Sequence, residues 1–64
     1  MNNQLNLFRG DFCHIAFNNG SNKMATFYEY ASNKYLFKSD NGFFEITEKE
    51  IRDGDIIIEI MPDF

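Results

Sequence analysis

Clusters of turn-forming residues divide this 64-residue chain into short runs. Glycine, asparagine, aspartate and serine gather at residues 9–11, 18–22, 32–33, 39–42 and 53–55. The runs between them are rich in phenylalanine, tyrosine, isoleucine and threonine, and they cover about residues 4–9, 12–17, 24–31, 34–38, 43–46 and 56–60. Because short aromatic and β-branched runs between frequent turns are typical of strands, the sequence predicts a small antiparallel sheet.

A single small domain over residues 1–64 is expected, since a chain of this length supports only one core. We predict a mainly β fold, either a small antiparallel five- to six-stranded meander or an SH3-like barrel. The Asn-Gly pairs at residues 19–20 and 41–42 suit hairpin turns, because both residue types accept positive φ. One short helical turn is expected near residues 47–52, where Thr47 and Glu50 have the spacing of a capping box.

Residues 22–33 allow a second interpretation, because apolar residues there fall at helical spacing and Ser21 can cap a helix. The residues with this spacing are Met24, Phe27, Tyr28, Ala31 and Tyr35. A helix at about residues 22–33 would give the α+β order of a ubiquitin-like β-grasp. We prefer a strand, because residues 26–30 have high β-propensity and can pair with residues 34–37.

The C-terminal part of the chain bears on the same choice. Within residues 46–60, Asp53-Gly54-Asp55 followed by alternating isoleucines resembles the close of β-grasp domains. SH3-like barrels also place one tight turn before their last strand. The resemblance is therefore compatible with both folds.

Composition and charge argue against several classes of function. Cys13 is the only cysteine, so no disulfide framework is expected. The sequence has no run of about 18 apolar residues for a membrane helix, and its first residues lack the pattern of a secretory signal. We therefore expect a cytoplasmic protein that does not bind membranes. The net charge of −4 also argues against direct binding to nucleic acid.

The amino-acid usage suggests an origin. Asparagine, isoleucine, phenylalanine and lysine are abundant, whereas valine and tryptophan are absent. An AT-rich coding sequence produces this skew, as in many phages and mobile elements of low-GC bacteria. We infer a phage or mobile-element protein, which would act in the host cytoplasm.

No catalytic residue, metal site or cofactor is expected. Cys13 and His14 are neighbours, and neighbouring strand residues point to opposite faces, so the two cannot form a catalytic pair. We expect Cys13, Ile15 and Phe17 to face the core and His14 to face outward. One cysteine and one histidine are too few for a usual zinc site, and Asp53-Gly54-Asp55 lacks the spacing of a calcium loop. The sequence therefore predicts a protein that is not an enzyme.

An aromatic face is the first candidate binding surface. Both faces of the middle hairpins are apolar in the strand interpretation, yet a small barrel has only one inner face. One residue of each opposed pair is then expected at the surface, where apolar patches usually mark interfaces. The partner-binding residues that we predict on this face are Phe27, Tyr35, Phe37, Phe43 and Ile57.

The acidic C-terminal end is the second candidate surface. The last twenty residues carry seven acidic and two basic residues, a net charge of −5, whereas the first 44 residues carry a net charge of +1. Carboxylates of this kind can steer a protein onto a basic surface, as in a DNA mimic. The candidate residues are Glu48, Glu50, Asp53, Asp55 and Glu59.

These features predict a small, non-enzymatic protein-interaction domain. In this hypothesis it is a phage or mobile-element inhibitor that binds a host or defence protein with a basic surface, and a homodimer is the simplest self-association. Two alternatives stay open. One is a small-molecule or nucleotide-binding sponge that stacks its ligand on the aromatic residues, and the other is a structural homo-oligomer that uses the aromatic face internally.

Overall fold

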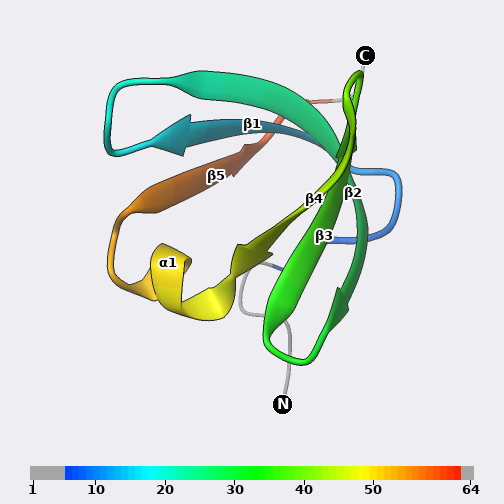
Figure 1. Cartoon of the computed structure of the whole chain (residues 1–64). Helices are drawn as coiled ribbons and strands as arrows, with labels where there is room; N and C mark the ends of the chain where they lie inside the picture. The colour runs from blue at the N-terminus through cyan, green and yellow to red at the C-terminus, as the bar shows by residue number, and fades with distance from the viewer. Residues whose placement is uncertain (1–5, 63–64) are drawn as a thin grey trace.

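The computed structural model describes residues 6–62, which form one antiparallel sheet and one short helix (Figure 1). The strands are β1 (Phe12–Phe17), β2 (Asn22–Ala31), β3 (Lys34–Ser39), β4 (Gly42–Thr47) and β5 (Ile56–Ile60), and helix α1 (Glu48–Arg52) lies between β4 and β5. The sheet has the order β4-β3-β2-β1-β5. The predicted mainly β fold is confirmed, and the five strands are consistent with a small meander or barrel-like fold.

Residues 22–33 form a strand and a turn, so the alternative helix at this place is wrong, and with it the β-grasp fold. β2 covers residues 22–31, and Ser32 and Asn33 have φ angles of 54° and 64°. These left-handed angles make the tight turn that joins β2 to β3. The aromatic and β-branched side chains of this segment therefore pair across a hairpin, which overrides their helical spacing.

The first predicted strand, at residues 4–9, is absent from the part of it that the structure describes. Residues 6–10 form a loop and a turn. The Phe8 N–H donates to Asp11 Oδ2 and the Asp11 N–H donates to the Phe8 carbonyl, both at 2.9 Å. Asn6 has a φ of 53°, which a strand does not accept. Residues 4–5 lie outside the described residues.

A bulge in β2 contributes to the curvature of the sheet. The pairing of β2 with β3 shifts between Phe27 and Glu29, so Tyr28 is the extra residue. Such a bulge bends its strand and increases the twist of the sheet. In Figure 1 the sheet curls, so that β5 at one edge faces β4 at the other and α1 connects the two.

The core lies on the concave, inner face of this curled sheet. Its buried hydrophobic residues come from the N-terminal loop and all five strands: Leu7, Cys13, Ile15, Ala25, Phe27, Tyr35, Phe37, Ile46 and Ile56. The Phe27 and Phe37 rings meet edge to face with centroids 5.6 Å apart. Each buried aromatic ring removes about 150–250 Å² from water, which compensates for the small size of the domain.

Helix α1 begins where the sequence predicts a capping box. The Glu50 N–H donates to Thr47 Oγ1 at 3.2 Å, and the Thr47 N–H donates to Glu50 Oε1 at 2.9 Å. These bonds satisfy backbone donors that the first helical turn otherwise leaves free. The predicted helical turn near residues 47–52 is confirmed. Within residues 6–62, no helix is long and apolar enough to cross a membrane.

Candidate functional site

The predicted aromatic face does not exist as one surface. Phe27, Tyr35 and Phe37 are 3 %, 1 % and 0 % exposed and form the centre of the core. Their placement at the surface is therefore wrong. The alternation of β2 and β3 puts these three residues on one face, but that face is the inner one, because it is continuous with Cys13 and Ile15 of β1.

The other two residues of that prediction are exposed but lie far apart in the sheet. Phe43 is 55 % exposed on β4 and Ile57 is 65 % exposed on β5. β4 and β5 are the two opposite edge strands, with β3, β2 and β1 between them. Phe43 lies at the end of β4 away from α1 and Ile57 at the end of β5 next to α1, so the two residues belong to different regions of the surface.

The structure assembles a different apolar patch on the outer face of the sheet. We call it the outer patch, and it consists of Phe12, Met24, Tyr28 and Phe43, from β1, β2 and β4. Strand register places Phe12 beside Thr26, Thr26 beside Lys38, and Lys38 beside Phe43. The Tyr28 ring meets the Phe43 ring edge to face at 5.4 Å between centroids. Four large apolar side chains are thus exposed along one face.

Cations border the outer patch. The Arg9 guanidinium lies 4.6 Å from the centroid of the Tyr28 ring, and its Nε donates to the Tyr28 carbonyl at 2.9 Å. Arg9 also pairs with Glu29 at 3.5 Å. Lys38 Nζ lies 5.8 Å from the centroid of the Phe43 ring. Together these contacts orient the aromatic rings at the edge of the patch.

Most of the predicted acidic residues have partners inside the domain. Glu48 is buried, and its Oε2 accepts a hydrogen bond of 2.5 Å from the Tyr30 hydroxyl. Glu50 completes the capping box described above. Asp53 pairs with Lys49 at 2.6 Å, and Asp55 accepts a 3.0 Å hydrogen bond from the Asn18 side chain. Glu48 is therefore not available at the surface, and the other three carboxylates have partners within the domain.

Three pKa values follow from these contacts. The hydrogen bond to Glu48 raises the pKa of Tyr30 to about 12, with burial as a second cause. The hydrogen bond between Lys49 and Asp53 raises the pKa of the lysine and lowers that of the aspartate. These residues have the protonation states that stabilise the fold at neutral pH.

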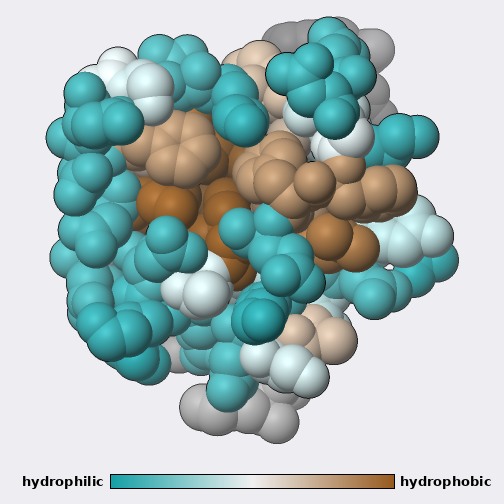
Figure 2. Space-filling model, viewed as in Figure 1, coloured by the Kyte–Doolittle hydropathy of each residue, from teal (hydrophilic) through white to brown (hydrophobic). Residues whose placement is uncertain are grey.

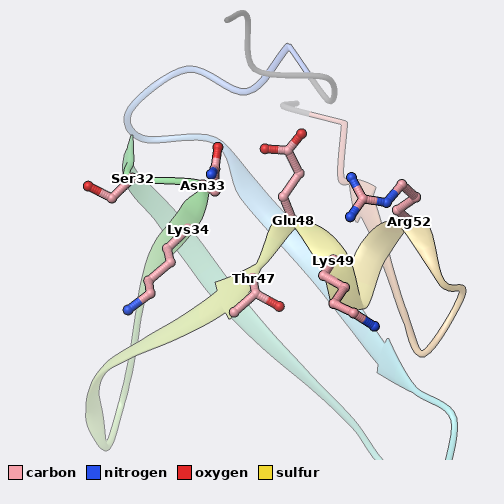
Figure 3. Close-up of a pocket in the computed structure, with 7 residues that line it drawn as sticks. All are labelled: Ser32, Asn33, Lys34, Thr47, Glu48, Lys49 and Arg52. Carbon is pink, nitrogen blue, oxygen red and sulfur yellow. The ribbon is translucent and has the colours of Figure 1, made fainter.

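A surface pocket of about 380 Å³ lies beside the start of α1. Its lining residues are Ser32, Asn33, Lys34, Thr47, Glu48, Lys49 and Arg52. Figure 3 shows the Arg52 guanidinium on the same side as the Glu48 carboxylate, whereas Lys34 and Lys49 extend away from it. The pocket thus combines one buried carboxylate with three cationic residues and has no aromatic lining.

Cys13 and His14 occupy the places expected of them. Cys13 is fully buried on the inner face, and His14 pairs with Met24 on the outer face. Burial raises the pKa of the Cys13 thiol to about 11, with Asp11 as a second cause. The thiol is therefore protonated and enclosed. Among residues 6–62, no three histidine, cysteine or acidic side chains come together as a metal site.

Comparisons of the chain with protein-family models, with curated proteins and with solved structures give no match. The surfaces are therefore interpreted from their own chemistry.

Three members of the outer patch were not among the predicted binding residues: Phe12, Met24 and Tyr28. A signal for them was present, because Phe12 and Met24 each precede a buried residue, Cys13 and Ala25. Strict alternation places both on the opposite, outer face. Tyr28 follows the same rule, because it comes directly after the buried Phe27, and the bulge changes only the orientation of the residues after it.

Proposed function

We propose that this domain is a non-enzymatic protein-interaction domain that binds a partner protein through the outer patch. The observation that carries the proposal is the convergence of Phe12, Met24, Tyr28 and Phe43 on one exposed face. Contiguous apolar patches on small domains usually mark interaction sites, and aromatic residues and methionine are enriched in interface cores. The Tyr28–Phe43 pair is the proposed anchor, because its rings are already in contact and lose little freedom on binding.

The skewed amino-acid usage supports a more specific form of the proposal. A phage or mobile-element protein of this kind acts in a host cytoplasm, where its partner is a host or defence protein that it inhibits. The net charge of −4 favours a partner with a basic surface. Glu59 and the partly paired Asp53 and Asp55 remain exposed and can contribute to this long-range attraction.

The test compares two exposed apolar positions. The partner is first isolated from a lysate of a low-GC bacterial host on the immobilised chain, then purified, and its affinity is measured for single variants. Phe43→Ala should weaken binding by at least tenfold, since the anchor is lost. Ile57→Ala is the matched control, because Ile57 is just as exposed but lies on the opposite edge strand. Equal effects of the two substitutions would contradict the proposal.

Self-association through the same patch is the structural alternative. Sedimentation of the isolated chain separates the two cases. A homodimer that Phe43→Ala dissociates would assign the outer patch to self-association and replace the partner-binding proposal.

Nucleotide binding is a second candidate function, and the pocket beside α1 is the observation that favours it. Arg52 supplies positive charge for a phosphate group, whereas Lys34 and Lys49 extend away and pair with Glu45 and Asp53. The aromatic residues once expected to stack the base are in the core, so charge alone would hold the ligand. A thermal shift with adenine nucleotides that Arg52→Ala removes, and Arg9→Ala does not, would support this function; no shift would rule it out.

A further inference from the structure

The outward edge of β5 is an unpaired row of backbone groups. Among residues 6–62, β5 pairs only with β1. The Met61 N–H donates to the Phe12 carbonyl at 2.8 Å, and the Asn18 N–H donates to the Asp55 carbonyl at 2.9 Å. Because hydrogen bonding alternates along an antiparallel ladder, residues 57 and 59 also face β1. The N–H and C=O groups of Ile58 and Ile60 therefore point away from it.

An apolar opening lies beside this edge. Figure 2 shows hydrophobic side chains gathered between β5 and β4, with hydrophilic side chains around them. On β5 itself, the inner-face residue Ile58, opposite Ile15, is only partly buried. Ile60, whose side chain also points to the inner face opposite Cys13, is 45 % exposed. A further strand beside β5 would bury these side chains.

Among residues 6–62, the edge of β5 has few of the features that usually prevent strand addition. Natural sheets usually protect their edges with lysine, proline, bulges or a covering segment. Four of the five residues of β5 are isoleucine, and Glu59 is its only charged residue. Glu59 is exposed and forms no ion pair within residues 6–62. Within the described residues, a single carboxylate is thus the only charged group that β5 itself presents.

Charge indicates whether a second copy of this chain or a different chain would pair with the edge of β5. Residues 42–60, which include β4, α1 and β5, carry six acidic and two basic residues, a net charge of −4. Two copies joined edge to edge would bring these acidic regions together, and like charges at an interface oppose association. A basic segment of another chain would instead be attracted to this acidic region.

We propose that the free edge of β5 binds an extended segment of a partner chain, antiparallel to β5, in which apolar residues alternate with basic ones. Its apolar side chains cover Ile58 and Ile60 at the opening, and its basic side chains lie beside Glu59. Its backbone bonds to the free N–H and C=O groups of the same two isoleucines. Strand addition of this kind draws affinity from the backbone and specificity from alternate side chains. The proposal uses a surface separate from the outer patch, so either can fail without the other.

The first experiment uses three synthetic heptapeptides as probes. One alternates lysine and valine, one alternates glutamate and valine, and one has the lysine–valine composition in two blocks. Each is titrated into the isotope-labelled full chain, and backbone amide shifts are followed. Only the alternating lysine peptide should bind, with the largest shifts at Ile58 and Ile60 and weaker binding in high salt. Equal binding of all three peptides, or shifts centred on Phe43, would overturn the proposal.

Methylated peptides test the backbone pairing without altering the protein. Residues opposite Ile58 or Ile60 in an antiparallel pair have side chains on the inner face and direct their N–H groups to β5. N-methylation of the central valine should therefore abolish binding, whereas N-methylation of a lysine should leave the affinity within about twofold, since cross-strand contacts are kept. Equal effects of the two modifications would contradict strand addition.

Variants of the protein complete the test. Glu59→Lys should weaken binding of the lysine peptide by about fivefold, in keeping with the strength of one cross-strand charge pair, and Glu59→Gln should have a smaller effect. Ile60→Pro removes an outward N–H but leaves the bonds to β1, so it should abolish binding, and Ile60→Val is its control. If sedimentation instead shows a homodimer that Ile60→Pro dissociates, the occupant is a second copy and the partner assignment is wrong.

Discussion

The two faces of the sheet place the same type of side chain in opposite surroundings. Phe37 on β3 and Phe43 on β4 lie in adjacent strands, yet the first is completely buried and the second is largely exposed. On the inner face, Phe37 contacts Phe27 and Phe44, with ring centroids 5.6 and 5.7 Å apart. On the outer face, Phe43 contacts one aromatic ring and one lysine. An abundance of phenylalanine therefore does not reveal whether a face stabilises the fold or binds a partner.

The largest expected difference between the faces comes from one pair of substitutions. Phe37→Ala should lower the free energy of unfolding by about 3–5 kcal/mol, because it leaves a cavity in the centre of the core. Phe43→Ala should cost less than about 1 kcal/mol, since its ring is mostly in water already. Urea denaturation followed by circular dichroism measures both. Similar losses for the two variants would refute the assignment of inner and outer faces.

Alkaline pH tests the inner face through Cys13. Its pKa is raised to about 11 from the usual 9.0, so the unfolded chain loses this proton first as the pH rises. The contribution of the protonated Cys13 to the free energy of unfolding is fully present below pH 9, and it should fall by about 2 kcal/mol between pH 9 and 11. Denaturation midpoints measured across this range provide the test. In Cys13→Ala this part of the pH dependence should disappear; an unchanged slope would mean that the thiol is not enclosed.

At the edge of the inner face, Tyr30 and Glu48 are joined by a hydrogen bond. Tyr30→Phe removes the donor and leaves a buried carboxylate oxygen to the water of the adjacent pocket, so it should cost about 1–2 kcal/mol. Tyr28→Phe is the matched control on the outer face and should change the stability little. Chemical denaturation of the two variants compares them. A larger loss for Tyr28→Phe would contradict the burial of the Tyr30–Glu48 pair.

The smallest expected effect concerns the N-terminal cap of α1, which lies outside both faces of the sheet. Thr47→Ala removes the N-cap and half of the capping box, and it should cost about 1 kcal/mol. Thr47→Ser keeps the hydroxyl oxygen and should restore most of the loss. Thermal unfolding of the two variants measures this. Equal melting temperatures for alanine and serine would show that the cap adds no stability.

Turn chemistry predicted most of the fold. The polar clusters around Asn19-Gly20, Ser32-Asn33 and Asn41-Gly42 all lie between strands, and Thr47 and Glu50 form the predicted cap. These signals are local, since each depends on the conformations open to a few neighbouring residues. Residues 6–9 show the limit of this reasoning. Their apolar character resembles a strand, but the side chain of Asp11 fixes a turn instead.

The candidate site was less predictable, because alternation separates two faces without saying which one is buried. Phe27, Tyr35 and Phe37 do share a face, but only the pairing of β2 with both β1 and β3 makes it the inner one. The bulge at Tyr28 adds a second obstacle. Strict alternation puts Tyr28 and Tyr30 on the same face, whereas the bulge turns Tyr30 inward against Tyr35, with ring centroids 4.7 Å apart. Neither fact is local in sequence.

The acidic end could be counted from the sequence but not interpreted. Glu48 becomes buried because α1 places it beside Tyr30, which lies eighteen positions earlier in the chain. Asp55 pairs with Asn18 across an even longer separation. A run of acidic residues therefore gives the net charge of a region and does not tell which carboxylates are free.

The pairing of β5 with β1 sets the order in which the protein folds. β1 to β4 follow one another as hairpins, so each of their ladders closes a short loop. β5 pairs with β1, from which three strands separate it in the chain. Closing this longer loop costs conformational entropy before the contacts between β5 and β1 can form. We therefore expect the hairpins to form first and β5 to dock last, with its amide hydrogens among the first in the sheet to exchange with solvent. We expect this last docking step to set the folding rate.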